Sequence, residues 1–139
     1  MYHEMSYRVP YADTDQMGVV YYANYLEYFE RSRTEMLREA GLSYSTMEKM
    51  GYFLPVSEAY CKYSSSARYD DLLTFRSFIE EISRVKVKIR SEVLRDGKLL
   101  VSGYVTLGCV DANFRISRLT PEMIECCKKC MAPRRMNND

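Results

Sequence analysis

The chain has 139 residues, of which 47% are hydrophobic, so one domain of ordinary size can bury a core without help from metals or disulfides. Its formal net charge of +1 excludes an extended nucleic-acid-binding surface. The first residues lack the features of a signal peptide and no stretch approaches the roughly 20 apolar residues of a membrane span, so we expect a cytoplasmic protein.

The five cysteines do not predict a metal site or a disulfide framework. Their odd number prevents complete pairing, and a cytoplasmic protein keeps its thiols reduced. Cys126, Cys127 and Cys130 are spaced like ligands, but the only histidine, His3, is distant in the sequence. We therefore expect ordinary helix cysteines and no bound metal.

The first half of the chain predicts a short strand followed by a long helix. Residues 7–11 alternate in polarity, and Pro10 places this strand at a sheet edge or at its own end. From about Tyr22 to Ala40 the apolar period becomes helical, and Gly41 is a typical terminating residue. A helix of that length spans about 27 Å, enough to cross a small domain. Residues 43–50 predict a further short helical turn.

The second half predicts antiparallel strands and one final helix. Strands are expected at 53–63, 72–82, 84–94 and 99–110, with a tight turn at Asp96-Gly97 and a central position for the last strand. Thr120 and Pro121 predict the start of a helix that continues to about Met131. The expected fold is α+β, with one domain at 1–132 and a frayed tail at 133–139.

The stretch from Ala12 to Tyr25 contains the best candidate for chemistry. Two carboxylates, Asp13 and Asp15, and a glycine, Gly18, come directly before the long helix. The first N–H groups of a helix lack intrahelical partners, so they can stabilise a carbonyl oxygen that gains negative charge. Sequence spacing does not distinguish a reactive aspartate from one that caps or turns the chain.

The same stretch resembles a known family. Tyr11-Ala-Asp-Thr-Asp-Gln-Met-Gly-Val-Val-Tyr-Tyr-Ala-Asn-Tyr25, followed by Glu30-Arg-Ser-Arg-Thr-Glu-Met-Leu37, is similar to hotdog-fold acyl-CoA thioesterases of the 4-hydroxybenzoyl-CoA thioesterase-like family, especially the branch associated with the Tol-Pal cluster. The resemblance covers about 110 residues, to Asp111. It implies a curved antiparallel sheet wrapped around one central helix, and hydrolysis of acyl-CoA to a free acid and CoA-SH without a cofactor.

The resemblance also implies roles for individual residues. Asp15 matches the catalytic carboxylate, which acts as nucleophile or as general base for a water. Asp13 is then expected to be a neighbouring residue with a structural role. The backbone N–H of Tyr22 matches the group that polarises the thioester oxygen, and Tyr11 matches a tyrosine beside the carboxylate. Tyr22 departs from the Tol-Pal branch, where histidine is common, and agrees with the 4-hydroxybenzoyl-CoA enzymes.

Further residues are expected to bind substrate. Arg84 falls near the basic residues that meet the phosphates of CoA, and Lys86 and Lys88 extend that strand face, although a solvated sheet face explains all three equally well. The complete set of candidate substrate-binding residues is Met17, Gly18, Val19, Tyr25, Arg68, Arg84 and Lys86. Tyr25 is also a candidate for core or dimer packing.

The resemblance places active sites between two protomers, so we expect a homodimer or a tetramer. Two alternatives belong to other classes. A hotdog dehydratase would use a histidine, and His3 is far from Asp15 in the sequence. A non-catalytic module that binds acyl-CoA or acyl-carrier protein would keep the pocket without needing Asp15. The identity of the acyl group is not readable from the sequence.

Overall fold

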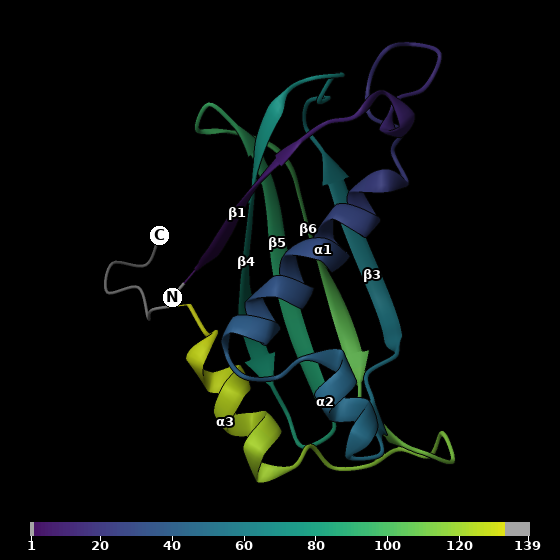
Figure 1. Ribbon diagram of the computed structural model, residues 1–139, viewed down its shortest axis with the longest axis vertical. Helices are drawn as coiled ribbons and strands as arrows, with labels where there is room; N and C mark the ends of the chain where they lie inside the picture. Colours follow the sequence, from purple (N-terminus) through teal and green to yellow (C-terminus); the bar gives the residue numbers. More distant parts are fainter. Residues whose placement is uncertain (1, 133–139) are drawn as a thin grey trace.

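The computed structural model describes residues 2–132, and the predicted tail at 133–139 lies outside them. Figure 1 shows a curved sheet with the long helix α1 packed along its inner side. The elements in chain order are β1 (His3–Arg8), the 3₁₀ helix η1 (Tyr11–Asp13), α1 (Asn24–Glu39), α2 (Tyr44–Lys49), β2 (Tyr52–Phe53), β3 (Val56–Tyr63), β4 (Leu72–Ile82), β5 (Lys86–Arg95), β6 (Lys98–Gly108), β7 (Val110–Asp111) and α3 (Pro121–Lys129). The α+β prediction is confirmed.

The main sheet has five strands in the order β1-β4-β5-β6-β3, with every neighbouring pair antiparallel. β2 and β7 form a separate two-stranded sheet. The Asp96-Gly97 turn joins β5 to β6 as predicted, and both of its residues have positive φ, which the tightest hairpin turns require. β6 lies inside the sheet, as its apolar sequence predicts, and among the described residues β3 is an edge strand.

α1 buries one stripe of side chains against the sheet, as its 3.6-residue period predicts. Tyr28 stacks on Phe75 of β4, with ring centroids 4.9 Å apart. Phe29 lies over Gly103 of β6, where an added Cβ would be 2.8 Å from the Phe29 ring and would overlap the Tyr60 carbonyl oxygen. Glycine at 103 therefore lets the helix approach the sheet closely.

Several boundaries differ from the sequence prediction. The first strand covers His3–Arg8 instead of 7–11, and it ends before Pro10, which has no N–H for the ladder and precedes η1. The strand predicted at 53–63 is divided into β2 and β3, and between them the Pro55 carbonyl accepts the N–H of Gly108. Arg84 lies before β5, in a turn where the Ser83 N–H donates to the Lys86 carbonyl.

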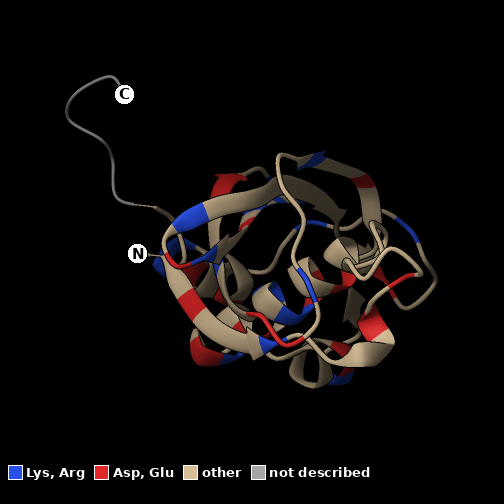
Figure 2. Cartoon of the chain, turned by 90° about the horizontal axis from the view of Figure 1, so that it is seen from above, with Lys and Arg blue, Asp and Glu red and all other residues tan. Residues whose placement is uncertain are grey.

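The described part of the chain has no helix that is long and apolar enough to cross a bilayer. In the view of Figure 2, acidic and basic residues are interspersed along the elements. This distribution agrees with the small net charge of the sequence.

Candidate active site

The loop between η1 and α1 folds back on itself as a tight turn. Thr14 and Val20 pair as an isolated antiparallel bridge, and the Asp15 N–H donates to the Val19 carbonyl at 2.9 Å. The Gly18 N–H donates to the Asp15 carbonyl at 3.0 Å, with φ of +77° at Gly18, a conformation that favours glycine. The turn therefore fixes the backbone of Asp15.

The carboxylate of Asp15 is half-buried and only partly engaged. Its Oδ1 accepts the N–H of Met17 at 2.8 Å, whereas Oδ2 has no hydrogen-bond donor among residues 2–132. Met17 lies at the tip of the turn, with 77% of its surface exposed. The arrangement orients the carboxylate through one oxygen and leaves the other without a donor among these residues.

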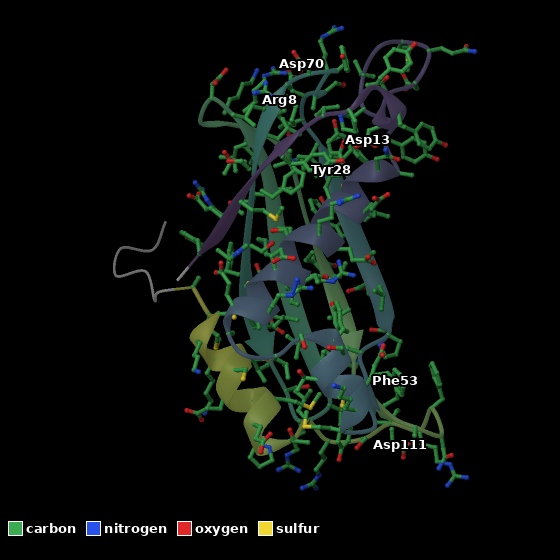
Figure 3. All side chains as sticks on the ribbon, in the orientation of Figure 1. Arg8, Asp13, Tyr28, Phe53, Asp70 and Asp111 are labelled. Carbon is green, nitrogen blue, oxygen red and sulfur yellow. The ribbon has the colours of Figure 1, made fainter. Side chains whose placement is uncertain are left out.

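Asp13 has a different environment, although it is only two residues away. Its Oδ2 accepts hydrogen bonds from the hydroxyls of Tyr7 at 2.7 Å and Tyr28 at 2.8 Å, and its carbonyl accepts the N–H of Tyr21. Figure 3 shows Asp13 and Tyr28 beside each other near the start of α1. Burial, together with the Asp13 carboxylate, raises the pKa of Tyr7 to about 12 and raises that of Tyr28 as well. Asp13 is thus a structural anchor.

α1 starts at Asn24, two residues later than predicted, so Tyr22 precedes the helix. The Asn24 N–H donates to the Tyr21 carbonyl at 2.9 Å and the Leu26 N–H to the Ala23 carbonyl at 3.2 Å, so a tight turn leads into the helix. No side chain caps this end. Within residues 2–132, the N–H groups of Tyr22 and Ala23 have no acceptor and are available to a developing anion.

Exposed tyrosines surround this helix start. The Tyr63 hydroxyl donates to the Tyr22 carbonyl at 3.0 Å, while the Tyr22 side chain is 62% exposed. A hydrogen bond with Tyr22 raises the pKa of Tyr21, and the charge of Asp15 contributes in the same direction. The rings of Tyr21 and Tyr22 are in contact, with centroids 4.9 Å apart.

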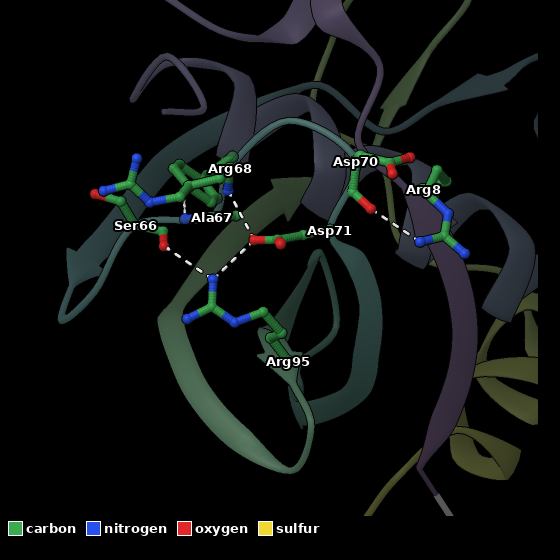
Figure 4. Close-up of polar contacts among 8 residues, drawn as sticks. Arg8, Ser66, Ala67, Arg68, Asp70, Asp71 and Arg95 are labelled. Atoms are coloured by element: carbon green, nitrogen blue, oxygen red, sulfur yellow. Dashed lines mark hydrogen bonds and ion pairs between the residues drawn. The ribbon is translucent and has the colours of Figure 1, made fainter. Parts of the chain in front are cut away.

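A network of polar contacts among charged residues joins the segment before β4 to the end of β5 (Figure 4). The Asp71 carboxylate accepts the Arg68 N–H at 2.8 Å and pairs with the Arg95 guanidinium at 2.7 Å. Burial alone would raise the pKa of Asp71, but these two donors hold it below its usual value. Val19 forms a backbone bridge with Arg68, and the Val20 N–H donates to the Ala67 carbonyl, so the network holds the Asp15 turn in place.

The remaining predicted residues occupy three different environments. Tyr25 is buried in the core, with its hydroxyl accepting the Ala67 N–H at 3.0 Å. Tyr11 is 77% exposed, and its ring lies edge-on to Tyr69 with centroids 5.8 Å apart; within residues 2–132 no hydrogen bond joins its side chain to Asp15. Arg84 and Lys86 lie at the opposite end of the sheet, where β4 turns into β5.

The structure adds two groups that the sequence did not indicate: the N–H of Ala23 and the hydroxyl of Tyr63. Ala23 directly follows Tyr22, so a helix start placed two residues later would have indicated its N–H. Tyr63 is 41 residues from Tyr22, and only the fold brings the two together.

Comparisons with known proteins show the family of this α+β chain. A family model described as the thioesterase-like superfamily matches residues 9–131. The chain is 35% identical over 105 residues to the acyl-CoA thioesterase YbgC of Haemophilus influenzae, covering 75% of this chain and 77% of that one.

Solved structures agree with this assignment. A hypothetical protein from Thermus thermophilus superimposes with a TM-score of 0.89 at 31% identity, covering 96% of this chain and all of the other. The DHNA-CoA thioesterase of Staphylococcus aureus gives a TM-score of 0.87 at 31% identity, covering 92% and 89% of the two chains. The chain belongs to the thioesterase-like superfamily, and the resemblance to hotdog thioesterases is confirmed.

Proposed function

We propose that this protein hydrolyses acyl-CoA thioesters at Asp15, with the N–H groups of Tyr22 and Ala23 holding the thioester oxygen. The observation that carries the proposal is one loop with two features: an Asp15 carboxylate of which one oxygen has no donor, and a helix start whose Tyr22 and Ala23 N–H groups have no acceptor within residues 2–132. Membership in the thioesterase-like superfamily supplies the reaction class. The names of similar proteins, such as YbgC and the DHNA-CoA thioesterase, support a CoA thioester as substrate.

The chemistry requires a nucleophile and a site for negative charge. Asp15 attacks the carbonyl carbon itself or removes a proton from the attacking water, after which the carbon–sulfur bond breaks and CoA-SH leaves. The carbonyl oxygen becomes negative during the attack, and fixed N–H donors at a helix start stabilise that charge by about 3–4 kcal/mol. Both N–H donors belong to the backbone, so tyrosine in place of histidine at position 22 leaves them in place.

Residues around the turn border the proposed substrate path. Met17, Gly18 and Val19 form the part of the turn that follows Asp15, and Arg68 pairs with Val19 through the backbone. The Arg68 side chain is exposed, so it can meet a phosphate of CoA. Tyr25 supports the site from the core instead of lining it.

The function is tested by release of free thiol from a panel of acetyl-, long-chain and aromatic acyl-CoA esters. We expect the purified protein to release CoA-SH from at least one ester with multiple turnovers. Tight binding of these esters without any thiol release would contradict hydrolysis and favour a binding module.

We further propose that two copies pair through β3. Every residue of this edge strand except Cys61 is exposed, including Val56, Tyr60 and Tyr63, whereas β1 at the other edge alternates between half-buried and exposed positions. A long exposed edge with free backbone groups is a template for pairing with a second chain. A two-fold axis would join the two β3 strands antiparallel and make one continuous sheet.

Pairing through β3 predicts that the protein sediments as a dimer, or as a tetramer built from such dimers. Analytical ultracentrifugation should give at least twice the 16.3 kDa mass of one chain. Ala59→Lys, which adds a charge in the middle of β3, should shift the protein toward monomer, whereas Glu48→Lys on α2 serves as a surface control. A monomeric wild-type protein would contradict the proposed pairing.

A further inference from the structure

The end of β3 lies beside the first turn of α1 (Figure 1). Tyr63, the last residue of β3, donates its hydroxyl hydrogen bond to the Tyr22 carbonyl at 3.0 Å, across 41 residues of sequence. The same carbonyl accepts the Tyr25 N–H at 3.4 Å, so the hydroxyl gives it the shorter hydrogen bond. A side chain from an edge strand therefore holds the backbone immediately before the helix.

The hydrogen bond from Tyr63 bears on the direction of the Ala23 N–H. The Tyr22 carbonyl and the Ala23 N–H belong to one peptide group, which is planar and trans. In a trans peptide group the C=O and the N–H point in opposite directions, so fixing one of them fixes the other. The Tyr63 hydroxyl therefore orients the Ala23 N–H, which is one of the two donors proposed to hold the thioester oxygen.

The other proposed donor, the Tyr22 N–H, is held in a different way. Its peptide group contains the Tyr21 carbonyl, which accepts the Asn24 N–H at 2.9 Å. A backbone turn thus fixes this donor without help from a side chain. Loss of the Tyr63 hydroxyl should therefore disturb the Ala23 N–H and leave the Tyr22 N–H in place.

A hydrogen bond to the carbonyl also strengthens the N–H of the same peptide group. Hydrogen bonds arranged in a chain polarise one another, and here the chain runs from the Tyr63 hydroxyl through the Tyr22–Ala23 peptide group to the thioester oxygen. The oxygen carries most negative charge in the transition state, so a stronger donor lowers the barrier more than it tightens substrate binding.

The Tyr63 side chain is itself held in place. Its ring lies edge-on to the rings of Tyr22 and Tyr25, with centroids 6.3 Å and 5.6 Å away. Tyr25 is buried, and its hydroxyl accepts the Ala67 N–H at 3.0 Å, so it offers Tyr63 a fixed surface. Burial raises the pKa of the Tyr63 hydroxyl, and the neighbouring Cys61 thiol acts in the same direction. The hydroxyl therefore keeps its proton and remains a donor.

We propose that Tyr63 is a positioning residue of the thioesterase site, whose hydroxyl orients and polarises the Tyr22–Ala23 peptide group so that the Ala23 N–H meets the oxygen that becomes negative. This inference rests on the proposed thioesterase function. Tyr63 acts through the backbone and takes no part in bond making, while Asp15 attacks the carbonyl or activates the water.

Tyr63→Phe tests this role because it keeps the ring and removes only the hydroxyl. Measured with the ester of the acyl-CoA panel that turns over fastest, kcat should fall about 10-fold, less than the roughly 10²–10³-fold typical for loss of an oxyanion donor itself. KM should stay within about twofold of the wild-type value, since the effect belongs to the transition state. A wild-type kcat in Tyr63→Phe would overturn the inference.

Tyr104→Phe is the matched control. Tyr104 lies on β6 and alternates with the buried Gly103 and Val105, so its side chain faces away from α1 and the proposed site. This variant should keep the wild-type kcat and KM, and the Tm of both variants shows that they are folded at the assay temperature. Equal losses of kcat in Tyr63→Phe and Tyr104→Phe would overturn a specific role for Tyr63.

Nuclear magnetic resonance of isotope-labelled protein observes the peptide group itself, without substrate. The resonances of the Tyr22 carbonyl carbon and the Ala23 amide nitrogen should both shift in Tyr63→Phe, because their peptide group loses a hydrogen bond. The Tyr22 amide nitrogen should stay close to its wild-type position, and Tyr104→Phe should move none of the three. Unchanged carbonyl and amide resonances in Tyr63→Phe would overturn the inference.

The kinetic and resonance measurements together separate this inference from the proposed hydrolysis. Failure of the wild-type protein to release thiol from any ester would contradict the proposed function, and the resonances would still decide whether Tyr63 holds the peptide group. Shifted resonances with a wild-type kcat would overturn the role of Tyr63 and leave hydrolysis intact. A lower kcat, an unchanged KM and shifted resonances in Tyr63→Phe alone are the result that we expect.

Discussion

Asp13→Ala should lower the free energy of unfolding by about 3 kcal/mol, because hydrogen bonds to a charged acceptor contribute about 1.5–3 kcal/mol each and two are lost. The Tyr28 side chain is buried and would keep a hydroxyl without its partner. Urea unfolding followed by circular dichroism measures the change.

Two variants act as controls for this prediction. Asp13→Asn keeps an oxygen acceptor at the same position, so its loss of stability should be smaller than that of Asp13→Ala. Asp15→Ala removes only the hydrogen bond to the Met17 N–H at the surface, so its unfolding midpoint should stay close to that of the wild type. Equal midpoints for Asp13→Ala and the wild type would show that the tyrosine contacts do not anchor the loop.

The sequence predicts the helices and the long strands well because their periodicities are strong. α1, β4, β5, the Asp96-Gly97 turn and α3 all occur where the pattern places them, within a few residues. The break at Pro55 was missed because the apolar alternation continues on both sides of it. What ends the strand there is pairing across the fold, including the hydrogen bond from Gly108 to the Pro55 carbonyl.

The separate roles proposed for the two aspartates are not readable from the sequence, for a similar reason. The sequence shows two aspartates at positions 13 and 15, and their spacing does not separate their roles. The difference arises from Tyr7 and Tyr28, which reach Asp13 through the packing of β1 and α1 and leave Asp15 in the turn. The apolar pocket lined by Phe53 and Phe114 is not readable from the sequence, because its lining comes from residues 44–55 and from Phe114, which lie at least 59 residues apart.

Asp15→Asn should lower the rate of thioester hydrolysis by about 10²–10⁴-fold, the range typical for loss of a catalytic acid or base. Asparagine keeps the shape of the side chain and the oxygen that accepts the Met17 N–H, so the turn should be preserved. The amide lacks the negative charge that either attacks the carbonyl or removes a proton from water. The expected defect is therefore in kcat, with little change in substrate affinity or in Tm.

Asp15→Glu and Asp13→Asn sharpen this prediction. Glutamate keeps the charge but moves it by one methylene, so the rate should fall substantially because catalysis depends on accurate placement. Asp13→Asn should retain most of the activity at temperatures where it is folded, since Asp13 only supports the loop. Similar losses of kcat in Asp13→Asn and Asp15→Asn would mean that the two aspartates act together.

The most direct test of the central claim is the kcat of wild-type and Asp15→Asn protein, measured by CoA-SH release from the ester that the panel shows to be the best substrate. The structure predicts that the variant is folded, binds the ester and loses nearly all turnover. An Asp15→Asn protein that hydrolyses the same ester at the wild-type rate would contradict the assignment of Asp15 as the reacting group.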